Sequence, residues 1–367
     1  MKSRPKAVLP GDLSMLRSFV GMDVESVIIS QYPGDATHHS RYCSAWHLLD
    51  SGQGRDEADV VNKLIEIASS EATSPVLYYG DDAMLLLISR NRERLQEHYR
   101  FNMPSRELVE ACTCKKNFEI LAQEKGLPIP RGLRSSSALD CETIEKEIGF
   151  PCIFKPGSHV GWEISDAVKS AANTSQKVLF ANDQLECMTA LKSMKDFTDD
   201  FIVQEYIPGG EEQIYSFHTY IPRGSMGRTS YIGKKIRTYP SVGGVSSYLE
   251  LVDAPEVQRL GFDIIEKLEI TGPVKIDFKK DTRTNRYFVL EINLRFNLWN
   301  YLGTRCGINL PYMAYMDSCS FEYAPSREYQ TGVRWLDFGL DFRGFIREYY
   351  PSGQLSLLSW LRSFLCP

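Results

Sequence analysis

The sequence lacks the features that would direct it to a membrane or to nucleic acid. Its 367 residues contain no apolar run near the roughly 18 residues that span a bilayer. The basic N-terminal segment is not followed by the apolar stretch of a signal peptide. A formal net charge of -5 leaves no basic excess of the kind that nucleic-acid binders carry. We therefore expect a soluble, cytoplasmic protein with no membrane partner and no nucleic-acid partner.

The sequence also lacks the cysteine patterns of a disulfide framework or a structural zinc site. Its nine cysteines form no C-x-x-C pair. Cys112 and Cys114 lie closest together, and we favour free thiols in a reducing cytosol over a metal role for them. No Ser-His-Asp or Cys-His signature is present, so a covalent enzyme nucleophile is not expected.

The first hundred residues alternate between two kinds of segment. Apolar, strand-like stretches at 6–10, 26–30 and 75–79 are separated by helical patterns, one of them capped by Asp56. This alternation predicts a parallel α/β sheet, in which ligands bind beyond the carboxyl ends of the strands. Gly11 with Asp12, and Gly80 with Asp81 and Asp82, follow such strands. They are either ligand-binding edges or plain turns.

The remainder of the chain mixes helices with strands and is too long to share one core with the first part. A helical stripe at 113–126 ends at Gly126, with Pro128 just beyond. The overall class is therefore α/β with α+β character. Further helices are predicted near 140–148 and 255–268, and strands at 150–156, 201–207, 213–221, 229–238, 273–280 and 287–293.

The last two strands carry the strongest chemical signal. Apolar residues alternate there with Lys275 and Asp277 on one strand and with Glu291 and Asn293 on the other, so each polar pair shares a face. An odd loop such as 282–286 would place Asp277 opposite Glu291. Paired buried carboxylates need a positive partner, and a hard cation such as Mg²⁺ accepts carboxylates, phosphates and water. The alternative is a solvated polar face on an exposed hairpin.

Two lysines precede this acidic set. Lys155 ends an apolar strand before the loop at 157–163, and Lys115 lies near the start of the 113–126 helix. Lysines at these places can reach phosphate oxygens, while loop N–H groups wrap them. Each alone would more often be a surface charge, but the pair followed by carboxylates favours a phosphate site. His159, in the loop, is a further candidate for a phosphate contact.

These motifs, in this order, resemble the ATP-grasp superfamily. The order is Lys115 with G-L-P at 126–128, then FPCIFKP, VQEYIPGGEE, KIDF and VLEINLRFN. The resemblance covers residues 110–317, and the stretch from 290 to 315 is similar to the carboxylate–amine ligase branch that includes D-aspartate ligase-like enzymes. It implies an ATP-grasp fold after an N-terminal Rossmann-like domain. Leu294 stands where many relatives have proline, and the 157–163 loop is poorer in glycine than is common.

The resemblance implies a role for each matching position. Lys115 and Lys155 would bind ATP phosphates, Glu205, Tyr206 and Ile207 would line the adenine, and Glu212 would hold the ribose. Asp277, Glu291 and Asn293 would hold one or two Mg²⁺ ions, or Mn²⁺. Arg295 and Lys275 would face the phosphoryl group or the developing oxyanion and would be catalytic. Lys234, Lys235 and Arg237 lie on one strand and are, from their position, candidates for binding the acidic substrate or the acyl phosphate. We count Arg237 among the catalytic residues, and the alternative is an exposed basic strand.

The implied activity is ATP-dependent joining of a carboxylate to an amine through an acyl phosphate, with amino-acid-type substrates. Other ATP-grasp chemistry, such as carboxylation or phosphotransfer, and a regulatory ATP-binding protein are the alternatives. Three regions are expected: 1–112, 113–325 with a small lid near 150–210, and an aromatic-rich extension at 326–367. Aromatics in the extension indicate core or a subunit contact, as in a homodimer, and a membrane-surface helix at 355–365 is a lesser alternative.

Overall fold

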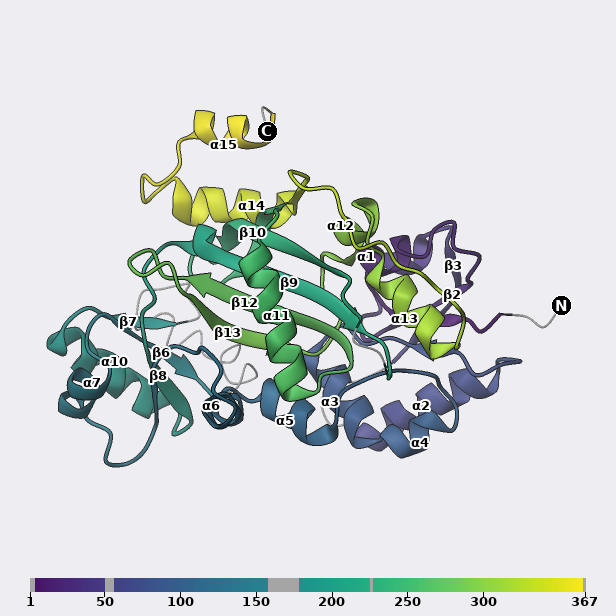
Figure 1. The fold of residues 1–367 in the computed structure, drawn as a ribbon, viewed down its shortest axis with the longest axis horizontal. Coiled ribbons are helices and arrows are strands. Elements are labelled where there is room, and N and C mark those ends of the chain that lie inside the picture. The colour runs from purple at the N-terminus through teal and green to yellow at the C-terminus, as the bar shows by residue number, and fades with distance from the viewer. Residues whose placement is uncertain (1–3, 50–55, 158–177, 225–226, 366–367) are drawn as a thin grey trace.

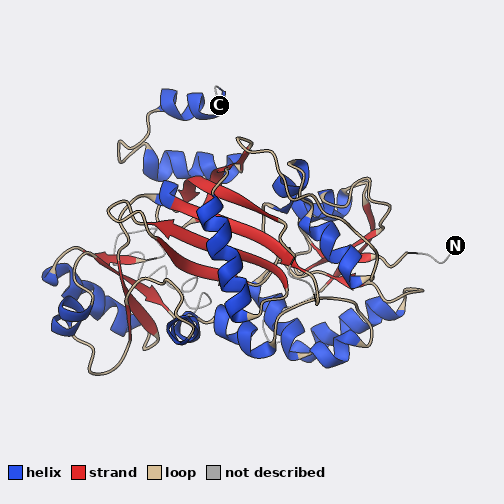
Figure 2. Ribbon diagram, in the orientation of Figure 1, coloured by secondary structure: helices blue, strands red, loops and turns tan. Residues whose placement is uncertain are grey.

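The computed structural model describes residues 4–49, 56–157, 178–224 and 227–365, and its elements form three sheets with their helices (Figure 1). None of the helices in these ranges is long and apolar enough to cross a membrane. The three sheets lie side by side along the long axis (Figure 2).

The N-terminal sheet is parallel, as the alternating pattern predicts. Its strands run in the order β3-β2-β1-β4. Asp56 caps α2, and buried Val60, Val61 and Leu64 share one face of that helix. The strands are β1 (Ala7–Pro10), β2 (Ser26–Ser30), β3 (Cys43–Leu48) and β4 (Val76–Leu77), and the helices are α1 (Leu13–Arg17), η1 (Ala36–His39), α2 (Glu57–Ser69), α3 (Asp82–Arg90), α4 (Arg92–Gln96) and α5 (Arg106–Thr113).

The predicted helix at 113–126 is confirmed as α6 (Lys115–Glu124), which begins two residues later than predicted. Helix α5 ends at Thr113, Cys114 adopts an extended conformation, and α6 (Lys115–Glu124) begins at once. Gly126 has a φ of 60°, which suits glycine at a helix end. The extended Cys114 places Lys115 at the first position of α6, beside the small sheet, where the Lys115 N–H donates to the Gly157 carbonyl at 3.2 Å.

The small sheet is antiparallel, with the order β5-β8-β6-β7. It starts at residue 132, ahead of the predicted lid boundary near 150, because β5 pairs with β8. Its apolar face packs on α7 and α10 around Phe154, Met194 and Val203. The elements are β5 (Gly132–Arg134), α7 (Cys141–Glu147), β6 (Cys152–Pro156), β7 (Leu179–Ala181), α10 (Gln184–Phe197) and β8 (Phe201–Glu205).

The central sheet has six antiparallel strands in the order β13-β12-β9-β10-β11-β14. Helix α11 crosses one face of it (Figure 1), where Gly261 packs directly on the Phe217 ring. The elements are η2 (Glu211–Gln213), β9 (Ile214–Ile221), β10 (Ser230–Tyr239), β11 (Val245–Leu251), α11 (Pro255–Leu268), β12 (Gly272–Lys280), β13 (Tyr287–Asn293), α12 (Asn300–Arg305) and α13 (Leu310–Ser318).

The C-terminal residues add to the central sheet and cover one end of it. The edge strand β14 (Arg334–Leu336) pairs with β11, so part of the predicted 326–367 extension is integral to the sheet. Three helical segments follow: α14 (Phe338–Gly344), the π-helical η3 (Phe345–Tyr349) and α15 (Leu357–Leu365). Trp360 is buried and stacks on Phe345, with 4.7 Å between the ring centroids, so this aromatic tail forms a small core of its own.

Candidate functional site

The β12–β13 hairpin places the two predicted carboxylates directly opposite each other. Asp277 pairs with Glu291, as predicted, but the loop is the even 281–286 rather than an odd one. A β-bulge resolves the difference, because Phe278 pairs with Val289 and Leu290 is left as the extra residue. The bulge restores the register at Asp277 and brings Leu290 to the wall of a cavity.

Asp277 is buried among positive charges. It accepts from Lys275 Nζ at 2.8 Å and from the Ser216 hydroxyl, and Lys235 Nζ lies 3.7 Å away. Burial alone would raise the pKa of Asp277, but Lys275 and Lys235 hold the pKa well below its ordinary value. Asp277 is therefore ionised, and two lysines meet at one carboxylate inside the protein.

A series of hydrogen bonds leads from the β12–β13 hairpin towards the N-terminal sheet. It runs through Glu291, Asn293 and Arg295. Asn293 Nδ2 donates to Glu291 Oε1 at 3.0 Å, and Arg295 Nη2 donates to Asn293 Oδ1 at 3.2 Å. Arg295 Nε donates to Asp82 Oδ1 at 2.6 Å. Arg295 thus joins the hairpin to the residues that follow β4, which the sequence offered as a ligand edge or a plain turn.

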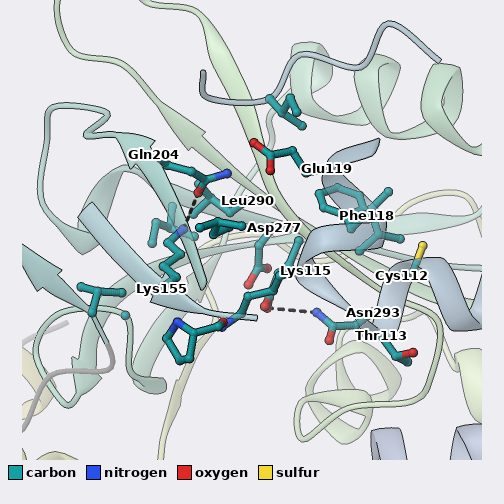
Figure 3. Close-up of a pocket in the computed structure, with 18 of the residues that line it drawn as sticks. Cys112, Thr113, Lys115, Phe118, Glu119, Lys155, Gln204, Asp277, Leu290 and Asn293 are labelled. Carbon is teal, nitrogen blue, oxygen red and sulfur yellow. Dashed lines mark hydrogen bonds between the residues drawn. The ribbon is translucent and has the colours of Figure 1, made fainter. Parts of the chain in front are cut away.

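A first cavity, of about 230 Å³, lies between the small sheet and the central sheet (Figure 3). Its walls combine apolar residues such as Ile202, Ile214 and Leu290 with the polar Lys115 and Lys155. A flat aromatic base and a chain of phosphates would match this division into an apolar part and a charged part.

The two predicted phosphate lysines face this cavity from different elements (Figure 3). Lys155, on β6, donates to Gln204 Oε1 at 2.9 Å, and Lys115, on α6, donates to the Pro156 carbonyl at 3.1 Å. Burial and the charge of Lys115 lower the pKa of Lys155 to about 8. Gly157 begins the predicted loop, but its residues 158–163, with His159, lie outside the described residues.

The last residue of β8 and the residue after it use their N–H groups within the protein. The N–H groups of Glu205 and Tyr206 donate to the carbonyls of Arg131 and Pro151. The Glu205 carboxylate accepts from Arg131 Nε at 3.0 Å, and Ile207 is buried. An adenine at this segment would therefore have to be read by its remaining backbone groups.

The two consecutive acids at 211–212 have different surroundings in the structure. Glu211 lines the first cavity, and its Oε2 is buried without a hydrogen-bond partner among the described residues. The Glu212 carboxylate instead accepts from the Gly210 N–H within its own turn. Sequence reasoning chose Glu212; the neighbouring Glu211 is the acid that the turn presents to the cavity.

A second cavity, of about 520 Å³, lies between the central sheet and the N-terminal sheet. Gly11, Asp12, Gly80, Asp81 and Asp82 line it, so both proposed ligand edges reach this cavity. Lys275, Arg295, Asn297 and Trp299 line it from the central sheet and the residues after β13.

The two cavities share one polar wall. Lys235, Asp277, Glu291 and Asn293 line both of them. A group bound in one cavity and a group bound in the other would therefore meet the same charges. This wall contains all three predicted metal ligands together with a lysine that the sequence named only as a substrate candidate.

Arg237 does not join this wall, which corrects its predicted place in the site. It is buried, and its guanidinium makes two 2.8 Å hydrogen bonds to Asp341 while lying over the Tyr248 ring. A register shift between Lys235 and Arg237 breaks the strict alternation of β10. Arg237 therefore turns away from the face on which Lys235 meets Asp277, and strand alternation alone could not reveal this.

Glu119 is a site-lining residue that the sequence reasoning did not identify. It lies on α6 in the wall of the first cavity, only 2% exposed, and neither carboxylate oxygen has a hydrogen-bond partner among the described residues. Burial raises the pKa of Glu119. A side chain at Gly132 would lie 1.9 Å from Glu119 Oε1, so glycine makes room for this carboxyl group. No local sequence pattern marks such a residue.

The acidic part of the wall fits a hard cation. Within residues 4–49, 56–157, 178–224 and 227–365, no group of three or more His, Cys, Asp or Glu is arranged to hold a metal. The wall offers two carboxylates and one amide oxygen, which suits an ion whose other ligands are water and phosphate oxygens. Lys275 Nζ already lies 2.8 Å from Asp277 and 3.7 Å from Glu291, so a positive charge is accommodated between them.

Comparison with known proteins agrees with this architecture. No protein-family model matches the chain. A D-aspartate ligase from Enterococcus faecium is 24% identical over 250 residues, which are 66% of this chain and 58% of that enzyme. The matched region therefore spans less than two thirds of that relative's length.

Solved structures match over most of the chain. N5-carboxyaminoimidazole synthetase from Staphylococcus aureus, solved with ADP, has a TM-score of 0.68 at 12% identity and covers 96% of this chain and 87% of its own. L-amino acid ligase from Bacillus licheniformis has a TM-score of 0.62 at 12% identity, with coverages of 87% and 75%. The resemblance to the ATP-grasp superfamily is thereby confirmed, and the chain has the ATP-grasp fold.

Proposed function

We propose that this chain is an ATP-dependent ligase that activates a carboxylate as an acyl phosphate and joins it to an amine. The observation that carries the proposal is the wall shared by the two cavities, with Lys235, Asp277, Glu291 and Asn293 facing both. A phosphoryl donor on one side and an acceptor on the other would meet at these charges. We place the protein in the cytoplasm, where ATP is available.

The nucleotide would occupy the first cavity. Its base would lie in the apolar part between the sheets, and its phosphates would extend towards Lys115 and Lys155. The expected adenine-lining residues Glu205, Tyr206 and Ile207 are not part of the cavity wall themselves; they follow Gln204, which is. Lysine acts on phosphate as a point charge and needs no fixed geometry. The ribose hydroxyls would be accepted by Glu211, with Glu212 as the neighbouring candidate.

Asp277, Glu291 and Asn293 would hold Mg²⁺ or Mn²⁺ at the phosphate end. When bound, the ion would neutralise phosphate charge and orient the terminal phosphoryl group. Asp277 supports this role because it is kept ionised by Lys275 and Lys235. The two lysines would then be free to interact with the anionic reactants on either side of the wall.

The reaction consists of two displacements. A substrate carboxylate oxygen attacks the terminal phosphorus of ATP and ADP leaves, which gives an acyl phosphate. The amine then attacks the acyl carbon, and phosphate leaves from the tetrahedral intermediate. The protein's contribution is to position the reactants and stabilise charge. Arg295 and Lys275, which line the second cavity, would stabilise the carboxylate and the developing oxyanion.

The names of the relatives favour an amino-acid-type substrate. The sequence relative is called D-aspartate ligase, and one of the structural relatives is an L-amino acid ligase. The second cavity has room for such a molecule, with acidic residues on the side of Asp12 and Asp81 and basic residues on the side of Lys275.

The proposal is tested by phosphate release from Mg-ATP with amino acids and small acids, supplied singly and in pairs. A ligase releases phosphate with a particular pair, and hydroxylamine intercepts the acyl phosphate as a hydroxamate. Asp277→Asn and Glu291→Gln serve as inactive controls. Release stimulated by bicarbonate instead would favour carboxylation. ATP binding without stimulated release by any acceptor would favour a regulatory protein.

A further inference from the structure

The turn between β10 and β11 borders both cavities. Its glycines, Gly243 and Gly244, line the first cavity and the second, and Val245 and Ser246 continue along the second. The turn is tightly folded, because a side chain at Gly244 would lie 1.9 Å from the Pro240 carbonyl oxygen. Its conformation therefore sets part of the shape of the second cavity.

Two side chains of η3 hold the base of this turn. Glu348 Oε2 accepts from the Ser241 N–H at 2.6 Å. The Tyr349 hydroxyl accepts from the Thr238 N–H at 3.1 Å and donates to the Thr238 carbonyl at 2.9 Å. Backbone polar groups need partners when they are shielded from water, and here side chains of a distant segment provide them.

The segment that carries Glu348 and Tyr349 is anchored by a buried carboxylate. Asp341, on α14, is fully buried and accepts from the Ser247 hydroxyl at 2.9 Å and from Trp360 Nε1 at 2.7 Å. It also receives both hydrogen bonds from Arg237. A carboxylate with this many donors in a dry environment has a fixed position, so α14 and η3 have a fixed place on β10 and β11.

We propose that α14, η3 and α15, together called the C-terminal clamp, position the 240–244 turn and thereby set the affinity of the second cavity for its substrate. Glu348 and Tyr349 are the positioning residues, and neither lines the cavities. The inference rests on the proposed function for the identity of the bound molecules. The contacts themselves are independent of it.

The first test measures the turn without any substrate. Amide hydrogen exchange is followed at residues 238–244 in the Mg-ADP complex of wild type, Glu348→Ala and Tyr349→Phe. Loss of one hydrogen bond should speed exchange by about fivefold to tenfold at Thr238 or Ser241. Tyr350→Phe is the matched control, because Tyr350 is 59% exposed and makes none of the turn contacts described above.

The second test measures catalysis with the substrate pair that gives the largest phosphate release. Glu348→Ala should raise the KM of the substrate in the second cavity by about tenfold while kcat changes little. Glu348→Gln keeps an oxygen that can accept from Ser241, so its KM should lie between those of wild type and Glu348→Ala. The KM for ATP should stay within about twofold, because only Gly243 and Gly244 border the first cavity whereas four consecutive residues, 243–246, border the second.

Unchanged exchange at Thr238 and Ser241 would overturn the clamp, and so would faster exchange with an unchanged KM. Tyr349→Phe keeps the inference testable if Glu348→Ala fails to fold, because it removes a single hydroxyl. If no substrate pair is found, the proposed function fails while the exchange experiment still decides whether the clamp holds the turn.

Discussion

Lys155 gives the proposed nucleotide site a specific pH dependence. Its pKa is lowered to about 8 by burial and by the charge of Lys115. A nucleotide phosphate beside Lys155 favours the protonated amine, so the pKa rises on binding. The free protein must therefore take up a proton when a nucleotide binds above about pH 8.

The size of this uptake follows from the pKa. With a free-state pKa of about 8, binding takes up about 0.1 proton at pH 7, about 0.5 at pH 8 and about 0.9 at pH 9. The affinity contributed by Lys155 falls about tenfold per pH unit above pH 8, until the pKa of the bound state is reached. The folding stability contributed by Lys155 changes with pH in the opposite direction to the nucleotide affinity. Between about pH 8 and pH 10.5 this lysine binds more protons in the unfolded protein than in the folded protein, so stability rises with pH across that window.

Isothermal titration calorimetry with Mg-ADP in buffers of different ionisation enthalpy measures the proton uptake directly. Lys155→Gln should abolish the uptake and weaken binding at pH 7. Lys146→Gln, which removes a lysine side chain that is 83% exposed, should retain both. Equal uptake by wild type and Lys155→Gln would refute the assignment of this pKa to nucleotide binding.

Three further results are expected. Asp277→Asn should lower the free energy of unfolding in urea by about 3 kcal/mol, because the buried Lys235 and the partly buried Lys275 lose their counter-charge. Glu291→Gln changes a side chain that is 44% exposed and should cost less than about 1 kcal/mol, and equal losses would contradict the described burial. Both variants should lose Mg²⁺-dependent nucleotide binding in calorimetry, and retention by either would remove that residue from the metal set. Glu211→Ala should weaken Mg-ADP binding by about tenfold and Glu212→Ala by less than about twofold, and the reverse order would restore the original choice of Glu212.

Several elements could be predicted because their signals are local. Asp56 as a helix cap, the strand at Ser26–Ser30 and the helix at Pro255–Leu268 all follow from caps and periodicity within a few residues. The pairing of Asp277 with Glu291 also follows from alternation, although the loop that joins the two strands has an even number of residues and not the odd number that was predicted. The pairing survived because the bulge at Leu290 compensates for an even loop.

A second strand irregularity, on β10, explains why Arg237 does not lie where the sequence predicted it. Alternation places Arg237 on the face of Lys235, and basic residues near the end of a strand suggested a substrate site. A register shift on β10 reverses that face, and the partner that receives Arg237, Asp341, lies 104 residues further along the chain. Neither fact is encoded near Arg237, because a bulge depends on how two strands pair and a buried carboxylate on how a distant helix packs.

The position of Arg237 also changes what the basic residues of β10 mean. Lys235 faces the carboxylates at the wall between the cavities, and Arg237 faces a carboxylate on the clamp. One strand therefore connects the reacting groups to the C-terminal helices, with the 240–244 turn at its end. The basic residues of β10 therefore form two ion pairs on opposite faces of the strand. The Lys235–Asp277 pair lies at the proposed site of reaction, and the Arg237–Asp341 pair fixes the C-terminal clamp against the sheet.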